Sequence, residues 1–175
     1  LKILSSLCFN SFLNDKIYVE GIKDIDKIDI NNANKLGYKI KLLGFSEFFN
    51  NKFYQRVHPT LIKKDSYVAS IDGVLNAVIV DGYPVGQSII QGEGAGPAAT
   101  TSALISDISS ILRGNIKFPF SLSSRKRKKI IFESIEERFF SAYLRFEVTD
   151  KPGVLSNITK IFSKNKVSIK RLVQN

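Results

Sequence analysis

The 175 residues predict an α+β fold: a mixed, largely antiparallel sheet covered by helices, followed by part of a second, smaller domain. Three observations support this prediction. The strand patterns of the first half come in pairs joined by tight turns, not by helical crossovers. The strongest helical pattern comes only after them. A polar, serine-rich stretch at residues 114–140 then separates this half from a new run of alternating apolar residues.

The composition is typical of a soluble globular protein, with 43% hydrophobic and 24% charged residues. No apolar run approaches the roughly 18–20 residues that a membrane-spanning helix needs. The apolar stretch 1–13 contains too many polar residues for a signal peptide. The single cysteine, Cys8, precludes an internal disulfide and fits a reducing compartment, so we expect a cytoplasmic protein.

The net charge of +10 raises the alternative of a nucleic-acid-binding protein. The basic residues are mostly lysines spread along the whole chain, and the one true cluster is Arg125–Lys129, inside the polar stretch. Charge of this kind supports weak, salt-sensitive association and nothing specific. We therefore expect neither a nucleic acid nor a membrane as partner.

The N-terminal third predicts two helices around a short strand. Apolar residues at helical spacing indicate a helix over Leu1–Leu13, and Ile17–Val19 is a candidate strand. A second helix is expected over Asp24–Leu36, with Gly37 as its C-terminal stop. The chain begins with leucine, contains no methionine and ends just after a strand pattern, so we expect a fragment truncated at both ends.

Four strands follow. Tyr38–Phe49 and Lys52–Ile62 are expected to pair, although His58-Pro59 suits only an edge or a strand end. Val74–Val80 and Val85–Gln91 form a second pair, joined by Asp81-Gly82-Tyr83-Pro84, which has the chemistry of a hairpin turn.

The strongest helix is predicted over Pro97–Leu112, because proline is tolerated in the first helical turn. It closes a first domain at residues 1–113, and residues 114–140 are interpreted as a linker with some structure of its own. In residues 141–175, Ser141–Thr149 and Val167–Val173 alternate as strands, with a helix at Val154–Lys164 after the turn Asp150–Gly153. That order is a β-turn-α-β unit.

Three glycines in five positions, Gly92, Gly94 and Gly96, precede the strong helix. Counting from Gly94 gives the G-x-G-x-x-A form of a dinucleotide fingerprint, with Ala99 in the last position. The preceding strands are joined by hairpins, however, and no ribose-binding carboxylate follows the next candidate strand, Ile116–Phe120. Two readings remain open: a glycine turn required only by close packing, or one that touches a cofactor held mainly by another domain.

No other residue set predicts a catalytic centre. His58 is the only histidine, and beside Pro59 a structural role is favoured. Cys8 is expected in the core on the apolar face of the first helix, and Lys2 is expected to be solvated. The sequence has no zinc spacing, no P-loop and no paired-carboxylate motif, so we expect no metal site and no catalytic residue within the chain.

Several blocks, taken together and in order, resemble homoserine dehydrogenase. They are LKILSSLCFNSF (1–12), IYVEGI (17–22), ANKLGYKIKLLG (33–44), VHPTLI (57–62), IDGVLNAVIV (71–80) and GEGAGPAATTSALISDI (92–108). The match is to the substrate-binding and dimerisation part of that enzyme. From Tyr143 onward, VTDKPGVLSNI (148–158) resembles the start of an ACT regulatory domain, which has a ferredoxin-like fold and would be truncated here.

The resemblance implies an enzyme that interconverts L-homoserine and L-aspartate 4-semialdehyde by hydride transfer with NAD(P), in threonine, methionine and isoleucine biosynthesis. It places the cofactor on an N-terminal Rossmann domain absent from this chain, the proton-transfer lysine immediately before Leu1, and the substrate carboxylates and a monovalent-cation site further upstream. The isolated fragment is therefore expected to be inactive. Gly96 is expected against the nicotinamide cofactor, with Gly94 and Ala95 beside it. Glu93 and Pro97 depart from the commoner family pattern, and Pro97 removes one N–H from the turn.

The resemblance also implies partners. A homodimer or higher homo-oligomer is expected through strand faces that carry Ile40, Leu42, Val78 and Val80. An amino-acid effector such as threonine is expected at the ACT turn, at Asp150, Pro152, Gly153 and Val154. The alternative is a stand-alone amino-acid-binding regulatory protein without enzyme activity.

Overall fold

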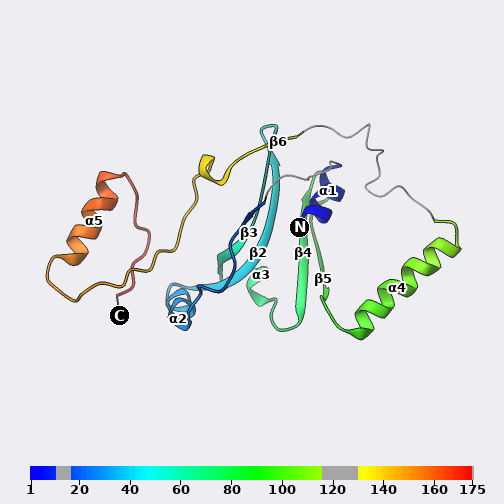
Figure 1. The fold of residues 1–175 in the computed structure, drawn as a ribbon, viewed down its shortest axis with the longest axis horizontal. Coiled ribbons are helices and arrows are strands. Elements are labelled where there is room, and N and C mark those ends of the chain that lie inside the picture. The colour runs from blue at the N-terminus through cyan, green and yellow to red at the C-terminus, as the bar shows by residue number, and fades with distance from the viewer. Residues whose placement is uncertain (11–16, 116–129, 175) are drawn as a thin grey trace.

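The computed structural model describes residues 1–10, 17–115 and 130–174. Its centre is a four-stranded sheet built on the long antiparallel pair β2 (Tyr38–Phe49) and β3 (Lys52–Lys63) (Figure 1). The short strands β1 (Tyr18–Val19) and β6 (Ile131–Phe132) both pair with β3 in parallel. The predicted α+β class, with mixed and mainly antiparallel pairing, is confirmed.

A tight turn joins β2 to β3. Asn50 and Asn51 have φ values of 49° and 62°, and asparagine is one of the few residues that adopts this left-handed region readily. Two successive residues with positive φ match the right-handed twist of a hairpin, and Phe49 accordingly pairs with Lys52. The predicted pairing of these two strands is therefore confirmed by local chemistry.

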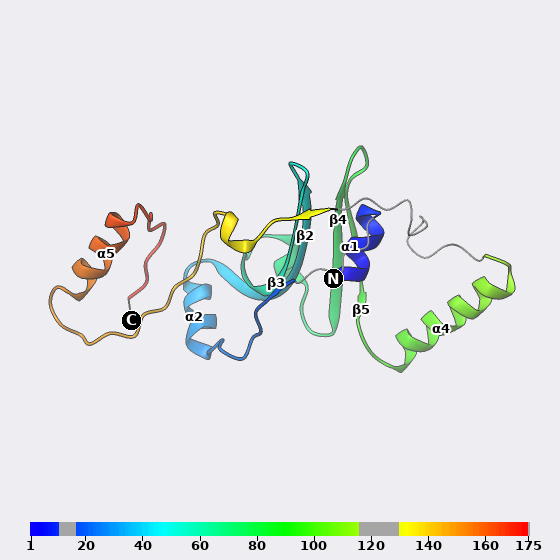
Figure 2. The same cartoon turned by 45° about the horizontal axis from the view of Figure 1, so that its top comes forward.

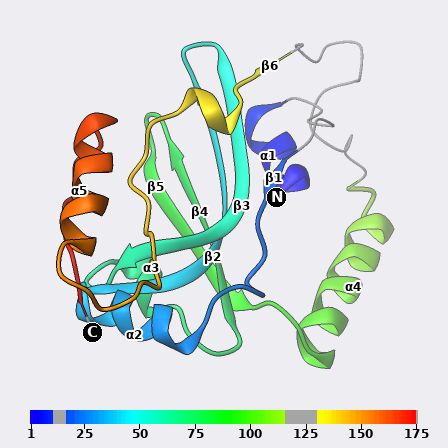
Figure 3. The same ribbon diagram turned by 60° about the vertical axis from the view of Figure 1, so that its left-hand side comes forward.

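The second predicted strand pair forms a separate two-stranded sheet of β4 (Leu75–Gly82) and β5 (Gly86–Glu93). Its ends meet at Gly82 and Gly86, so the hairpin turn lies at the expected place. Figures 1 and 3 show this hairpin as a long ribbon beside the main sheet. Neither strand has a buried residue.

Four predicted helices are present: α1 (Lys2–Phe9), α2 (Lys27–Lys35), α4 (Pro97–Leu112) and α5 (Val154–Lys164). The predicted continuation of the first helix to Leu13 lies outside the described residues, as do Arg125–Lys129 and the candidate strand Ile116–Phe120. The structure adds the short helix α3 (Tyr67–Ser70) and the 3-10 turn η2 (Ile135–Glu137). Helix α2 begins three residues later than predicted because Asp26 is its N-cap: the Asp26 side chain accepts from the Asp29 amide, and the Asp29 side chain accepts from the Asp26 amide.

The core of the described chain is small and lies on both faces of β3. Phe53 faces α1 and contacts the rings of Phe9 and Phe132, whereas Tyr54 lies on the other face near Phe45. Ser5 and Ser6 are the buried residues of α1, and the hydroxyls of Ser5 and Ser46 are in hydrogen-bond contact.

Cys8 was expected in the core, and that expectation is wrong. Helix α1 turns Ser5 and Ser6 toward the sheet, so Cys8 is exposed. The apolar residues Ile3, Leu4 and Leu7 of the helix are exposed with it.

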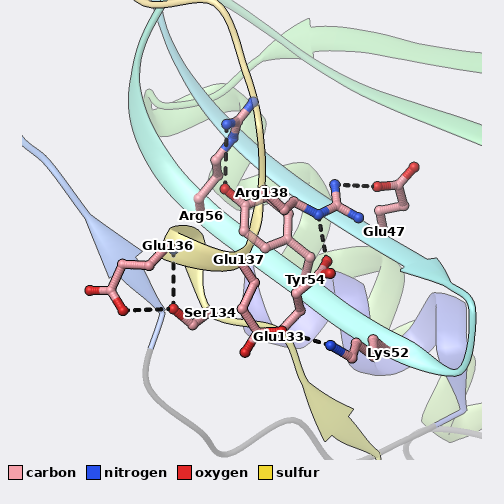
Figure 4. A network of polar contacts seen from close by, with 9 residues as sticks. All are labelled: Glu47, Lys52, Tyr54, Arg56, Glu133, Ser134, Glu136, Glu137 and Arg138. Carbon is pink, nitrogen blue, oxygen red and sulfur yellow. Dashed lines mark hydrogen bonds and ion pairs between the residues drawn. The ribbon is translucent and has the colours of Figure 1, made fainter. Parts of the chain in front are cut away.

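The segment after β6 is bound to the main sheet by Arg138. Its guanidinium pairs with Glu133 on its own segment and with Glu47 on β2, and it lies over the ring of Tyr54 on β3 (Figure 4). A third ion pair joins Lys52 to Glu137 at 2.6 Å. Part of the predicted linker thus packs on the first domain.

The two predicted strands around α5 are wrong. Residues 141–149 and 167–173 have no regular secondary structure and make no ladder with any described strand (Figure 2). In a split β-α-β unit the two outer strands do not pair with each other, since another strand lies between them. The described residues contain no such strand, so the alternation of apolar residues produces no sheet here. Only the helix of this unit is confirmed.

Candidate functional site

The glycine-rich stretch forms an exposed turn between β5 and α4. Gly92 is still inside the ladder, opposite Asn76, and β5 ends at Glu93. Gly94, Ala95 and Gly96 follow as the turn, and all three are exposed. The structure therefore brings the three predicted cofactor-binding residues together in one short strand-to-helix connection.

Gly94 is explained by packing. A Cβ added to it would lie 2.0 Å from Nδ2 of Asn76, and the same side-chain nitrogen donates to the carbonyl oxygen of Val74 at 3.3 Å. The amide of Gly94 donates to that carbonyl too, at 3.4 Å. Glycine fits here because the Asn76 side chain and the turn approach each other closely, and a larger residue would have to displace that side chain.

Gly96 is explained by backbone conformation. It is the N-cap of α4 with φ 122° and ψ 157°, a region that residues with a Cβ rarely adopt. A Cβ added to it would meet no described atom within 4 Å, so the space beside its Cα is open. This openness sets Gly96 apart from Gly94 and is the property that close approach of a ligand requires.

The first turn of α4 adds backbone donors to this open surface. Pro97 occupies its permitted position, and no side chain caps the helix. Helix geometry leaves the amides of Ala98 and Ala99 without acceptors inside the helix, whereas the Thr100 amide and hydroxyl both donate to the Gly96 carbonyl oxygen. The arrangement favours a polar or anionic ligand edge near Gly96.

Helix α3 and the loop after it connect the glycine turn to the main sheet. The Tyr67 hydroxyl donates to Oε1 of Gln91 on β5 at 2.5 Å. On the other side, Lys39 and Lys41 of β2 reach Asp72 at 2.8 and 2.5 Å. Hydrogen bonds from these two ammonium groups hold the pKa of the Asp72 carboxyl at about 2. Sequence analysis missed this connection, and the only signal for it is two lysines at alternate positions of one strand.

His58, the only histidine, has a structural environment, as the sequence favoured. Its Nδ1 lies 2.6 Å from the carbonyl oxygen of Pro59, and its ring contacts Tyr18 edge-on. Among the described residues, no group of three or more histidine, cysteine or acidic side chains could hold a metal ion. No helix in residues 1–10, 17–115 and 130–174 is long and apolar enough to cross a membrane.

The predicted effector turn is formed locally. Gly153 is the N-cap of α5 with φ 90° and ψ −12°, and the Val154 amide donates to the Lys151 carbonyl oxygen. Asp150 and Pro152 are exposed beside them. The geometry is that of a glycine-initiated helix, and effector binding there remains a prediction.

A buried carboxylate joins the C-terminal segment to helix α2, and sequence analysis missed it. Asp29 is 4% exposed, and its Oδ1 accepts from the Tyr143 hydroxyl at 2.9 Å and from Nε of Arg145 at 2.8 Å. Burial alone would raise the pKa of Asp29, but the bonds from the Asp26 amide, Tyr143 and Arg145 together lower it below its ordinary value. The sequence offered only one signal, a carboxylate at the third position of a capped helix.

Comparisons with known proteins agree on one family. The homoserine dehydrogenase family model matches residues 1–109. The chain is 36% and 37% identical to curated homoserine dehydrogenases of Pseudomonas aeruginosa and Helicobacter pylori, in alignments that cover 99% of it.

Solved structures give the same result. A homoserine dehydrogenase from Thiobacillus denitrificans covers 99% of the chain with a TM-score of 0.81 at 31% identity. One from S. aureus, solved at pH 7.5, covers 99% with a TM-score of 0.62 at 28% identity. The chain spans about 42% of the length of the first of the curated relatives and of the Thiobacillus structure. The chain belongs to the homoserine dehydrogenase family.

Proposed function

We propose that this chain is the substrate-side and cofactor-facing part of an NAD(P)-dependent homoserine dehydrogenase, which interconverts L-homoserine and L-aspartate 4-semialdehyde. The family match over residues 1–109 supports the reaction class, an oxidoreductase. The observation that carries the local role is the open backbone at Gly96, at the N-terminus of a helix that no side chain caps.

The residues of the turn fit a nicotinamide cofactor. The cofactor supplies the hydride acceptor or donor. The turn's own contribution is to let backbone lie against a flat ring or an amide edge where a side chain would obstruct it. Gly96 would make that contact, Ala95 would lie beside it, and Gly94 would hold the turn at the start of β4 through its amide bond to the Val74 carbonyl oxygen.

The proton-transfer lysine, the substrate-binding carboxylates, the monovalent-cation site and the main cofactor fold belong, in this proposal, to the part of the relatives' length that the chain does not match. The 175-residue chain alone is therefore expected to show no turnover. The enzyme would act in the cytoplasm, in the route to threonine, methionine and isoleucine.

Two partner proposals accompany this role. A homodimer or higher homo-oligomer would use the exposed apolar faces of the sheets, where Leu42 is 52% and Ile90 is 69% exposed. An amino acid such as threonine would bind at the turn formed by Asp150, Pro152, Gly153 and Val154. Exposed backbone at Gly153 supports this site in the same way as at Gly96.

The test is NAD(P)-linked oxidation of L-homoserine by the natural protein that contains this chain. Gly96→Ala should raise the KM for the nicotinamide cofactor by about tenfold or more, because a methyl group and a shifted backbone would both oppose close approach. Gly86→Ala is the matched control, since Gly86 also has positive φ, 80°, and open space but lies at the far end of the same hairpin.

Activity of the natural protein with equal cofactor KM values for the two variants would refute the role of Gly96. Absence of homoserine oxidation in the natural protein would refute the dehydrogenase, and binding of an amino acid without turnover would favour the stand-alone regulatory protein.

A further inference from the structure

The C-terminal segment is attached to helix α2 at both ends of that helix. At the N-terminal end, Arg145 bridges Asp29 and Asp26, both at 2.8 Å, and Tyr143 bonds Asp29. At the C-terminal end, the guanidinium of Arg171 donates to the carbonyl oxygen of Leu36 and lies 5.5 Å from the centroid of the Tyr38 ring. Figures 1 and 3 both show the C-terminal segment beside α2.

Helix α2 is in turn bound to the segment that leads into α3. Its last turn accepts a hydrogen bond from the Lys64 side chain at the Asn34 carbonyl oxygen, at 3.0 Å. The Lys64 amide donates to the carbonyl oxygen of Gly37 at 3.2 Å. Lys64 lies two residues before Ser66, the N-cap of α3, so a shift of α2 along its axis would move the start of α3.

Helix α3 then contacts the strand that ends in the glycine turn. Tyr67, its first residue, bonds Gln91 of β5, three residues before Gly94. The C-terminal end of α3 is fixed from the other side, because Lys39 and Lys41 bind the carbonyl oxygens of Ala69 and Ile71. The hydrogen bonds and ion pairs, joined by the backbone of α2 and of residues 64–67, therefore form a continuous route from Arg145 to Gln91.

We propose that helix α2 couples the position of the C-terminal segment to the glycine turn, and that Asp29 is the positioning residue at the head of this connection. The proposal rests on the assigned role of Gly96 for its effect on catalysis, but the mechanical coupling does not. Asp29 is suited to the task because its two oxygens join different parts: Oδ1 receives Tyr143 and Arg145, and Oδ2 receives the Asp26 amide of its own helix. Movement of residues 143–145 is thereby transmitted to the backbone of α2.

The experiment uses the natural protein that contains this chain, with Asp29→Asn, Arg145→Met and the double variant. Asparagine keeps an oxygen for the Asp26 amide and so spares the helix cap, while it removes the charge that holds Arg145. Amide hydrogen exchange of residues 86–96 is the first readout, and the KM for the nicotinamide cofactor, separated from kcat, is the second.

Each single variant should raise exchange at residues 86–96 and the cofactor KM by about three- to tenfold, with kcat nearly unchanged. The double variant should add little to either single one, since both cut the same contact. Arg145→Lys should restore part of the effect. Lys160→Met, an exposed site on α5, is the matched control and should leave both readouts at the unmodified values.

A second variant tests the other end of the connection. Tyr67→Phe removes only the hydroxyl that binds Gln91. In that background, Arg145→Met should no longer change exchange at residues 86–96. An effect of Arg145→Met that persists there, or a change confined to residues 141–147 in the single variants, would overturn the coupling.

The exchange measurement needs no turnover, so it decides the coupling even in a protein that does not oxidise homoserine. Normal exchange at residues 86–96 in a variant with raised KM would likewise reject it, and would leave the dehydrogenase itself intact.

Discussion

The guanidinium of Arg138 lies 4.3 Å from the ring centroid of Tyr54, one of the two largest fully buried side chains in the described chain. The same guanidinium pairs with Glu47 and Glu133, and its side chain is only 25% exposed. Arg138 therefore covers the face of the sheet that carries Tyr54. Arg138→Met should lower the free energy of unfolding by about 1–2 kcal/mol, through loss of the cation–π contact and two carboxylates left without their cation. Urea denaturation measures this. The control Arg113→Met, at the exposed end of α4, should stay within about 0.5 kcal/mol, and equal losses would contradict the assignment.

The two glycines of the turn should respond differently to alanine. Gly94→Ala pushes against the exposed Asn76 side chain, which can rotate away at the loss of its bond to Val74, so we expect a cost of about 1 kcal/mol. Gly96→Ala forces a side chain onto φ 122°, which costs about 1–3 kcal/mol.

A double variant distinguishes the two causes. Asn76→Ala should remove most of the penalty of Gly94→Ala and none of that of Gly96→Ala, as measured by chemical denaturation. Equal rescue of both alanines by Asn76→Ala would show that Gly96, too, is constrained by packing.

Acid should weaken the contact between β2 and the loop after α3. The pKa of Asp72 is about 2 in the folded chain against an ordinary value of 3.8, so its stabilising effect is complete above about pH 4 and lost as the pH falls through 2. Denaturation curves between pH 5 and pH 2 should therefore show a smaller loss of stability in Asp72→Asn than in the unmodified protein. Asp65→Asn, in the exposed turn before α3, is the control and should retain the full slope. An unchanged slope in Asp72→Asn would show that the lysine contacts do not persist in solution.

The exposed face of α1 gives a chemical test of what covers it. Cys8 is exposed in the described chain, next to Leu4 and Leu7 with 45% and 49% exposure. In the 175-residue chain, a thiol reagent should label Cys8 quickly under native conditions. In the longer natural protein the labelling should be at least about tenfold slower if this apolar face is covered there. Equal rates would show that the face stays open.

The sequence predicted those parts of the fold that local chemistry determines. The Asn50-Asn51 turn, the proline at the start of α4 and the alternation in β2 to β5 each specify their element within a few residues. The sequence did not predict the elements that depend on contacts with distant parts of the chain. Helix α3 has four residues and β6 has two, too short for any periodicity, and each is held by partners elsewhere in the chain.

The candidate site divides in the same way. The turn at Gly94–Gly96 was predicted because its residues are contiguous. Two other features depend on tertiary structure, and no spacing in the sequence predicts them. They are the packing of Gly94 on Asn76 and the connection from Asp29 to Arg145, which lie more than a hundred residues apart. The alternation of apolar residues at 141–149 and 167–173 gave a wrong strand prediction, because a strand also needs a partner strand to pair with.

The hairpin of β4 and β5 has no buried residue, and near the end that bears the glycine turn its Gln91 accepts a hydrogen bond from Tyr67 of α3. A two-stranded ribbon of this kind is only marginally stable by itself in water. If a second subunit covers the hairpin, the stability of the hairpin and of its glycine turn depends on protein concentration. Specific activity would then fall on simple dilution, in a sample in which every molecule is chemically intact, and added cofactor would drive the subunits back together.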